Sequence, residues 1–150
     1  MKDLTAQALR QEAGALEEKL TDIYHRLHMH PELGFQEKET AEIIRAELTK
    51  LGLPFTAVQT GTIVDLPVNG RMENAVLLRA DIDALPITEA TGLPYASRNP
   101  GVMHACGHDS HAAMLLGAAQ LLQGRRDQLR RPVRLVFQPA EETLGGASFM

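Results

Sequence analysis

In residues 75–83, AVLLRADID, a short apolar run is followed directly by charged residues, and this stretch decides how the fold is interpreted. The run from Ala75 to Leu78 is continuous and short, which is typical of a strand buried on both faces of a sheet. Asp81 and Asp83 follow at once, and their alternation places both side chains on one side of an extended segment. We therefore expect a buried strand whose carboxyl end carries acidic groups.

Helical segments alternate with short strands on either side of this stretch. Apolar residues recurring every three or four positions predict helices over residues 3–29, 37–51 and 110–123. Shorter apolar runs predict strands over residues 55–58, 62–66 and 133–137, with Gly61 between the first two. Gly52 is the expected C-cap of the second helix. The alternation predicts an α/β domain with a mixed, partly parallel sheet flanked by helices.

Composition limits the class of protein. The 150 residues are 44% hydrophobic and 23% charged, as expected for one globular domain. A net charge of −4 leaves no basic excess, so we expect no nucleic-acid partner. No apolar run approaches the ~18 residues of a membrane span, and the polar N-terminus is unlike a signal peptide. A single cysteine cannot form an internal disulfide, which favours a reducing compartment such as the cytoplasm.

A cluster at residues 104–111 holds three histidines, one cysteine and one aspartate. Cys106 and His108 flank Gly107, and a thiolate with an imidazole suits zinc and similar metals. A solvated histidine and a small buried cysteine are the plain structural alternative, but the density of these residues disfavours it. Because the chain has only one cysteine, a catalytic site with an open position is favoured over a closed structural zinc site.

Two adjacent carboxylates, Glu141 and Glu142, directly follow the predicted strand 133–137. They repel each other there unless a cation or a proton compensates. One can bind a metal ion while its neighbour takes a proton from water. Because sites in open α/β sheets lie beyond the carboxyl ends of strands, we expect these residues to meet Asp81, Asp83 and the 104–111 cluster. His28 and His30, by contrast, are interpreted as surface or capping histidines.

Four stretches carry a family resemblance, in order along the chain: residues 28–37 (HMHPELGFQE), 78–86 (LRADIDALP), 101–111 (GVMHACGHDSH) and 137–142 (FQPAEE). They resemble the N-terminal part of the aminoacylase-like metallopeptidases, in the branch that contains hippurate hydrolase and the indole-acetyl-amino-acid hydrolases. The resemblance implies a metal-dependent amidohydrolase. Such an enzyme uses two divalent metal ions, zinc or manganese, to cleave the amide bond of small N-acyl amino acids.

Carried over by position, the resemblance implies that Cys106, His108 and Glu142 are metal ligands and that Glu141 is the general base. It gives Asp83 a supporting role in catalysis. The roles of Asp81, Asp109 and His111 stay open. These last three residues nevertheless belong to the matching stretches.

The resemblance also implies parts that residues 1–150 do not contain. Relatives carry two further metal-ligand histidines and a satellite domain for dimerisation and closure over substrate. We therefore expect residues 1–150 to be the N-terminal part of the catalytic domain, with a homodimer expected only for the full-length relative. The chain alone is expected to have little activity and to expose apolar surface where further strands would pack.

Two other functions stay open. One is a cysteine hydrolase that uses Cys106 with His108 or His111. The other is a non-catalytic metal-binding fragment. A chelator separates the first alternative from a metal enzyme, because it abolishes only metal-dependent activity. Fewer than one tightly held ion per chain, without turnover, would favour the second.

Overall fold

The computed structural model describes residues 5–143 and 145–150. Its four-stranded sheet has the order β1-β2-β4-β3, in which β3 and β4 are parallel and the other pairs antiparallel. The mixed sheet with its helices confirms the predicted α/β class. The main elements are α1 (Ala6–Gly14), α2 (Glu17–Met29), α3 (Lys38–Lys50), β1 (Thr56–Val58), β2 (Gly61–Leu66), β3 (Val76–Asp81), α4 (His108–Gln123) and β4 (Val133–Gln138). Two short 3-10 helices, η1 (Arg126–Gln128) and η2 (Gly146–Phe149), flank β4.

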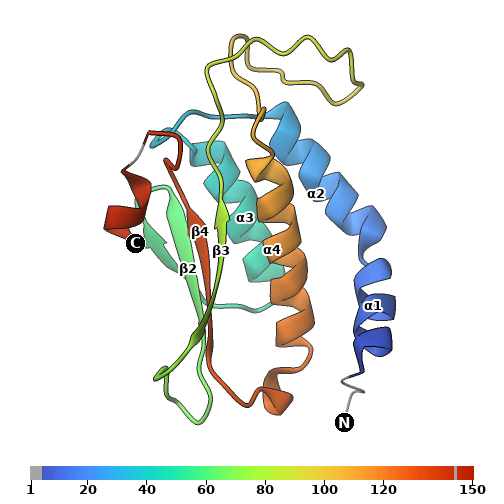
Figure 1. Cartoon of the computed structure of the whole chain (residues 1–150), viewed down its shortest axis with the longest axis vertical. Helices are drawn as coiled ribbons and strands as arrows, with labels where there is room; N and C mark the ends of the chain where they lie inside the picture. Colours follow the sequence, from blue (N-terminus) through green and yellow to red (C-terminus); the bar gives the residue numbers. More distant parts are fainter. Residues whose placement is uncertain (1–4, 144) are drawn as a thin grey trace.

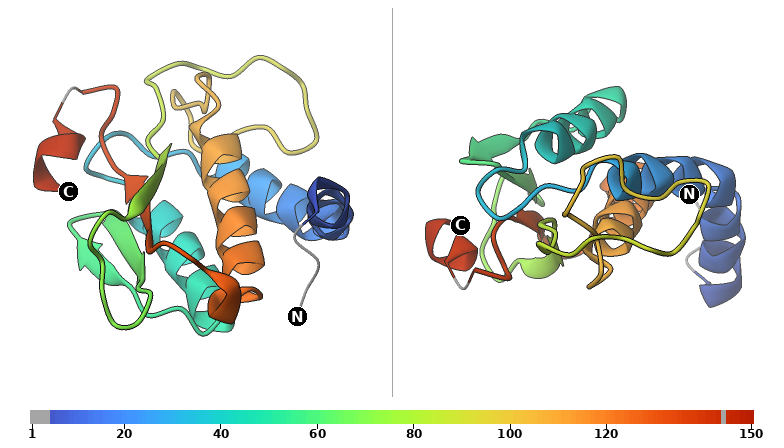
Figure 2. Two further views of the ribbon diagram at one scale, coloured as in Figure 1. Left: turned by 60° about the horizontal axis from the view of Figure 1, so that its bottom comes forward. Right: turned by 90° about the horizontal axis from the view of Figure 1, so that it is seen from above.

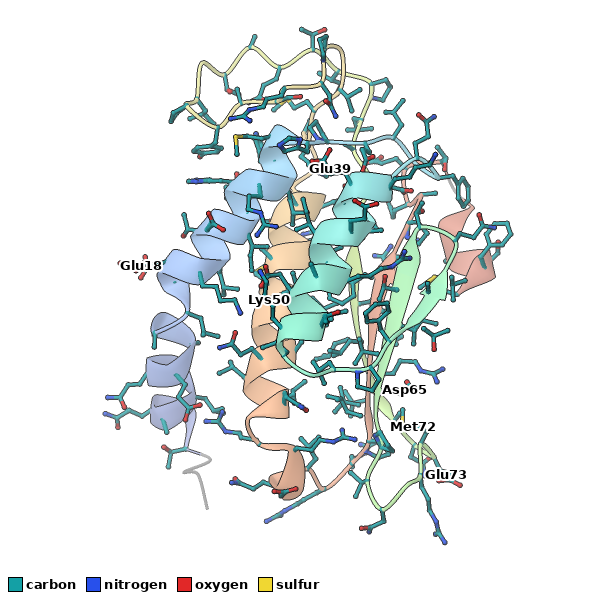
Figure 3. The ribbon with its side chains drawn as sticks, turned by 180° about the vertical axis from the view of Figure 1, so that it is seen from behind. Glu18, Glu39, Lys50, Asp65, Met72 and Glu73 are labelled. Carbon is teal, nitrogen blue, oxygen red and sulfur yellow. The ribbon has the colours of Figure 1, made fainter. Side chains whose placement is uncertain are left out.

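The helices α3 and α4 lie side by side against the sheet, and α2 packs on α4 (Figures 1 and 2). The core between these layers is formed by apolar side chains from every layer, including Leu27, Ile44, Leu116, Leu135 and Phe137. Figure 3 shows side chains filling the space between helices and sheet. Burying this apolar surface is the main driving force that fixes α4 against the two parallel strands.

The helix α4 begins at His108, two residues earlier than the sequence predicts. Gly107 precedes it in the left-handed conformation, with φ of +88°, and this turn leads the chain straight into the helix. His108 and Asp109 therefore belong to the first turn of α4 instead of the preceding loop. Gly52, with φ of +66°, follows α3 as the predicted C-cap position requires.

The predicted single helix over residues 3–29 is wrong. The described part of it forms two helices, because α1 ends at Gly14 and α2 starts at Glu17; residues 3 and 4 lie outside the described residues. Glycine is a weak helix former, and the break falls beside it. The hairpin β1–β2 also differs from its prediction, since Gln59 and Thr60 form the turn and Gly61 belongs to β2.

The strand β3 is longer than predicted and is not buried on both faces. Val76 is 39% exposed and Leu77 is 59% exposed. Within the part of the chain that the structure describes, β3 pairs with β4 alone and forms the edge of the sheet. Only the last two residues of β3, Ala80 and Asp81, are buried, so the expectation of two buried faces holds only at that end of the strand. None of the described helices is long and apolar enough to cross a membrane.

Candidate metal centre

The three groups of candidate site residues predicted from the sequence meet at one end of the sheet. They come from the end of β3, the start of α4 and the segment after β4. Asp81, the last residue of β3, pairs in register with Gln138, the last residue of β4. Because these strands are parallel, the residues that follow them start side by side, and α4 begins at the same end (Figure 1). The convergence predicted from the sequence is therefore confirmed for Asp81, Asp83, His108, Glu141 and Glu142, which ion-pair distances place around one imidazole.

That imidazole belongs to His108, which is 4% exposed. Its Nδ1 donates a hydrogen bond of 2.9 Å to the main-chain oxygen of Asp83. Its Nε2 faces the open side of the cluster, 3.8 Å from Glu142 Oε1 and 3.9 Å from Glu141 Oε2. Metal-binding histidines are commonly fixed in this way, with one nitrogen bonded to a carbonyl and the other left for the ion.

Cys106, His108 and Glu142 form one group of possible metal ligands. A ligand atom of each, the thiol sulfur, an imidazole nitrogen and a carboxylate oxygen, lies within 4.8 Å of the other two. Cys106 and His108 come from the two sides of Gly107, and Glu142 comes from the segment after β4. Mixed sulfur, nitrogen and oxygen donors are typical of zinc and related ions.

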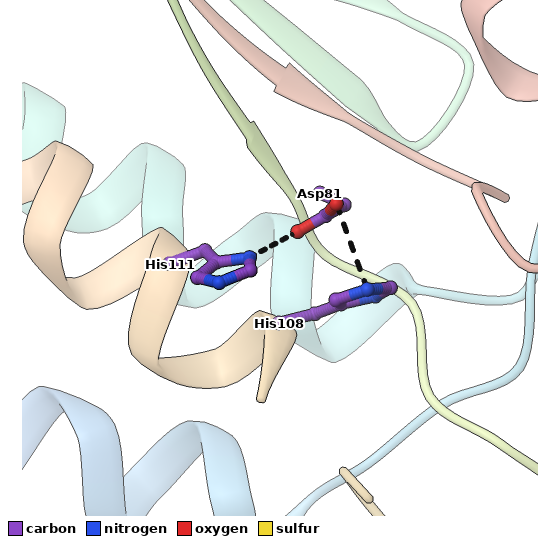
Figure 4. Close-up of side chains that lie close together, drawn as sticks. All are labelled: Asp81, His108 and His111. Atoms are coloured by element: carbon purple, nitrogen blue, oxygen red, sulfur yellow. Dashed lines mark hydrogen bonds and ion pairs between the residues drawn. The ribbon is translucent and has the colours of Figure 1, made fainter. Parts of the chain in front are cut away.

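Asp81, His108 and His111 form a second such group, with ligand atoms again within 4.8 Å. Figure 4 shows Asp81 between the two imidazoles. His111 Nδ1 lies 2.6 Å from Asp81 Oδ1, and His108 Nε2 lies 3.5 Å from Asp81 Oδ2. Arg79 contacts the same carboxylate at 3.1 Å. Because one imidazole nitrogen binds one ion, the two groups compete for His108.

The surroundings of the first group fit a divalent cation. Glu142 Oε1 is buried and has no hydrogen-bond partner among the described residues, and the buried Asp83 Oδ1 has only the His108 Nδ1 atom beside it, at 3.3 Å. Carboxylate oxygens in such places are usually compensated by a cation or by donors. Although burial opposes it, the carboxylates of Asp83 and Asp81 raise the pKa of His108. The local field therefore favours positive charge at the position that Nε2 faces.

The pKa values of two neighbours show the same excess of negative charge. The pKa of the exposed Cys106 thiol is raised to about 11, first by its hydrogen bond to Glu142 and then by a partial loss of hydration and by the charges of Glu142, Glu141 and Asp81. Burial would raise the pKa of Asp83, but hydrogen bonds from His108 and from the Glu142 amide hold it below its usual range. Asp83 is thus kept ionised beside the candidate ligands.

His28 contradicts the sequence-based expectation, because it is buried and not a surface histidine. Its Nδ1 donates to Asp109 Oδ2 at 2.6 Å. The partner is 81 residues away, so no local pattern could show this contact; the only signal was that both residues lie in stretches that carry the family resemblance. His30 is closer to expectation, with a side chain 28% exposed that pairs with Glu39 on α3.

His104 is a buried residue to which the sequence assigns no role. It is 5% exposed, and neither ring nitrogen has a hydrogen-bond partner among the described residues. Burial, with the positive charges of His28 and His108, lowers its pKa to about 4 against the opposing effect of Asp109. His104 is therefore neutral at pH 7.

The fold and this cluster together define an α/β domain with a candidate metal centre beyond its parallel strands. Residues 77–150 match peptidase family M20/M25/M40. Over these residues the chain is similar to this family, and the relatives below extend the similarity to most of the chain. The resemblance to aminoacylase-like metallopeptidases is thereby confirmed.

The relatives fall in the branch that the sequence motifs indicate. The chain is 52% identical to the N-acetyl-L-cysteine deacetylase of Bacillus subtilis (strain 168), over 89% of this chain and 32% of that protein. It is 47% identical to the IAA-amino acid hydrolase ILR1-like 4 of Arabidopsis thaliana, over 85% of this chain and 29% of that protein. The chain thus spans about a third of the length of these relatives.

A solved structure shows the same arrangement of elements. The Bacillus subtilis YXEP protein, described as a dinuclear metal binding peptidase from the M20 family, matches with a TM-score of 0.83 and 46% sequence identity. The match covers 90% of this chain and 38% of that one. At this identity the likeness extends beyond the fold.

Proposed function

We propose that this chain carries part of the active site of a metal-dependent amidohydrolase that cleaves the amide bond of N-acyl amino acids. The observation that supports it best is the approach of Cys106, His108 and Glu142 to within 4.8 Å, with Glu141 beside them. The names of two relatives, an N-acetyl-L-cysteine deacetylase and an IAA-amino acid hydrolase, indicate the same substrate class.

Cys106, His108 and Glu142 are the residues that would hold a divalent ion, and their donor set favours zinc. When bound, such ions polarise an acyl carbonyl and lower the pKa of water. Asp83 would orient two of these ligands by accepting hydrogen bonds from them. Its main-chain oxygen fixes the His108 ring, and its Oδ2 accepts a hydrogen bond of 2.9 Å from the Glu142 amide. One residue thus holds two of the proposed ligands.

Glu141 is the proposed general base. Its side chain is 39% exposed, and its carboxylate points to the same side as His108 Nε2. It takes a proton from the water that attacks the acyl carbon and returns it to the leaving nitrogen, so the products are a carboxylic acid and an amino acid. A cavity of about 430 Å³ beside Glu141, lined also by Arg79, Gln138 and Ser148, offers space for a small substrate.

The cysteine-hydrolase alternative is disfavoured. A nucleophilic cysteine needs a lowered pKa so that the thiolate is present at neutral pH. Here the pKa of Cys106 is raised to about 11 by its acceptor Glu142 and the surrounding carboxylates. Those same carboxylates favour a cation, which would stabilise the thiolate as a ligand.

The test is cobalt substitution. Titrating the chain with Co²⁺ is expected to produce a thiolate-to-cobalt charge-transfer absorption, because Cys106 is the only cysteine. The band should disappear in Cys106→Ser and persist in the control His30→Gln, which changes a histidine outside the cluster. A band that survives in Cys106→Ser, or no band in the unchanged chain, would refute the proposed ligand set. For the activity, any hydrolysis of N-acetyl amino acids by the chain, which is expected to be weak, should be abolished by a chelator and restored by Zn²⁺ or Mn²⁺.

A further inference from the structure

Glu37 is the last residue of the stretch 28–37, the one family-like motif to which the proposed function gives no part. Its side chain is fully buried, at 0% exposed. Oε1 accepts a hydrogen bond of 2.8 Å from the main-chain amide of Ala140, and Oε2 accepts one of 2.6 Å from the Thr60 hydroxyl. Burying a carboxylate costs free energy unless its oxygens accept hydrogen bonds. Both oxygens of Glu37 do so, and the two hydrogen bonds therefore offset the cost of its burial.

Ala140 is an unusual residue to hold in this way. It is fully buried and left-handed, with φ of +50°, a conformation that is unfavourable for a residue with a Cβ. Such strain persists only where the surroundings enforce it, and it is concentrated at functional sites. The next two residues are Glu141 and Glu142, so the left-handed turn determines where their side chains leave the backbone.

A second residue of the stretch 28–37, Gly34, also lies against the turn at Ala140. A Cβ built on Gly34 would lie 3.0 Å from Ala140 Cα, so the chain before Glu37 passes directly against the turn. On the other side, Asp83 accepts a hydrogen bond from the Glu142 amide. Two buried carboxylates, on segments far apart in the sequence, therefore hold the main chain immediately before and immediately after Glu141.

From this arrangement we propose that Glu37 is a positioning residue of the metal centre. By accepting the Ala140 amide it keeps that residue left-handed, and it thereby aims Glu142 at Cys106 and His108 and leaves Glu141 free beside them. The proposal rests on the proposed function for the identity of the site. The contact of Glu37 with Ala140 itself is independent of that function.

The first test measures the contact without any metal. Hydrogen exchange of the Ala140 amide should be slow in the unchanged chain and at least about 10-fold faster in Glu37→Leu, which keeps an apolar volume but removes the acceptor. Glu37→Gln keeps an acceptor oxygen and should restore slow exchange. Glu37→Asp retains the carboxylate but is one methylene shorter, and it should exchange faster; it replaces the leucine variant if that variant fails to fold. Unchanged exchange in Glu37→Leu, or in Glu37→Asp where the leucine variant fails to fold, would overturn the proposal.

The second test measures Co²⁺ affinity of the same variants by the cysteine-to-cobalt absorption. Loss of a residue that orients a ligand from behind commonly weakens metal binding 10–100-fold, and we expect this range for Glu37→Leu. Thr60→Val is the matched control, because it removes the other partner of Glu37 and leaves the Ala140 contact intact. It should lower the melting temperature while changing Co²⁺ affinity less than about threefold.

The outcomes separate the two proposals. If Thr60→Val weakens Co²⁺ binding as much as Glu37→Leu does, Glu37 merely stabilises the hairpin and the positioning role is refuted. If the unchanged chain binds no Co²⁺ through Cys106, the proposed function fails, while the exchange of the Ala140 amide still decides what Glu37 does.

Discussion

His28 Nδ1 donates a hydrogen bond of 2.6 Å to Asp109 Oδ2, and both side chains are buried. On the other side of the ring, Nε2 lies 3.3 Å from Glu89 Oε1, in the long segment between β3 and α4. The imidazole thus joins the end of α2 to that segment and to the first turn of α4. His108, the central residue of the candidate metal centre, lies beside Asp109 in this turn.

Replacing His28 by leucine is expected to destabilise the chain by about 3 kcal/mol, because two buried carboxylates, Asp109 and Glu89, lose the group that pairs with them. Urea unfolding measures the loss. His30→Leu is the matched control. His30 is 28% exposed and pairs with the exposed Glu39, so its replacement should cost less than about 1 kcal/mol. Equal losses for the two variants would show that the His28 link is not a stabilising one.

The adjacent residues Glu141 and Glu142 are expected to respond differently to the same change. Where the turnover of the unchanged chain is measurable, Glu141→Gln should lower kcat about 10²–10⁴-fold at nearly unchanged metal affinity, because it removes a general base that is not a proposed ligand. Glu142→Gln should weaken Zn²⁺ binding strongly, because it removes a ligand. Hydrolysis of an N-acetyl amino acid and calorimetric titration with Zn²⁺ measure the two effects. Reversal of the pattern would exchange the roles assigned to the two residues.

Two neighbouring glycines offer a test of the turn that carries Glu141. A Cβ built on Gly146 would lie 1.6 Å from the Pro139 carbonyl oxygen, so Gly146→Ala must displace the main chain. The expected cost is about 1–3 kcal/mol of stability, with weakened Co²⁺ binding. Gly145→Ala is the control, because its Cβ would meet only the Phe35 ring at 3.6 Å, an ordinary contact. If both variants melt like the unchanged chain, the close approach is not a constraint in solution.

The sequence predicts the candidate site better than it predicts the edges of the fold. Asp81 ends β3 and Glu142 lies shortly after β4, and the rule that sites form at the carboxyl ends of strands is enough to bring them to one place. The exposure of Leu77 could not be predicted in this way. A continuous apolar run indicates that a strand is covered, but it does not show which segment covers it, and β3 has a sheet neighbour on one side only in the described chain.

Two contacts near the candidate site join segments that are far apart in the sequence, so the sequence pattern does not predict them. The pairing of His28 with Asp109 and of Glu37 with Ala140 spans most of the chain, whereas periodicity and capping describe only neighbours in sequence. The helix break after Gly14 is local, but a helical apolar pattern continues across it, so the pattern alone favoured one helix. Tertiary packing of α2 on α4 decides the direction of the chain after the break.

The buried Glu47 on α3 provides a test of the fold that is independent of the metal centre. Its carboxylate is 3% exposed and lies 2.6 Å from Lys50 Nζ, at the end of α3 (Figure 3), and 3.3 Å from Arg26 Nη1 on α2. Burial alone would raise the pKa of Glu47, but the hydrogen bonds from Lys50 and Arg26 and the charge of Lys19 hold it below its usual value of 4.5.

Because the pKa of Glu47 is lower in the folded chain than in the unfolded chain, its contribution to stability is present above the unfolded value. It is lost as the pH falls through the folded value. At pH 7, Glu47→Gln should therefore reduce the free energy of unfolding by about 2 kcal/mol, and the difference from the unchanged chain should shrink below about pH 4. Urea unfolding at several pH values measures this. Glu42→Gln, an exposed position on the same helix, should cost less than about 0.5 kcal/mol at every pH. A loss at Glu47 that is independent of pH would mean that packing, and not the charge, holds α2 to α3 at this point.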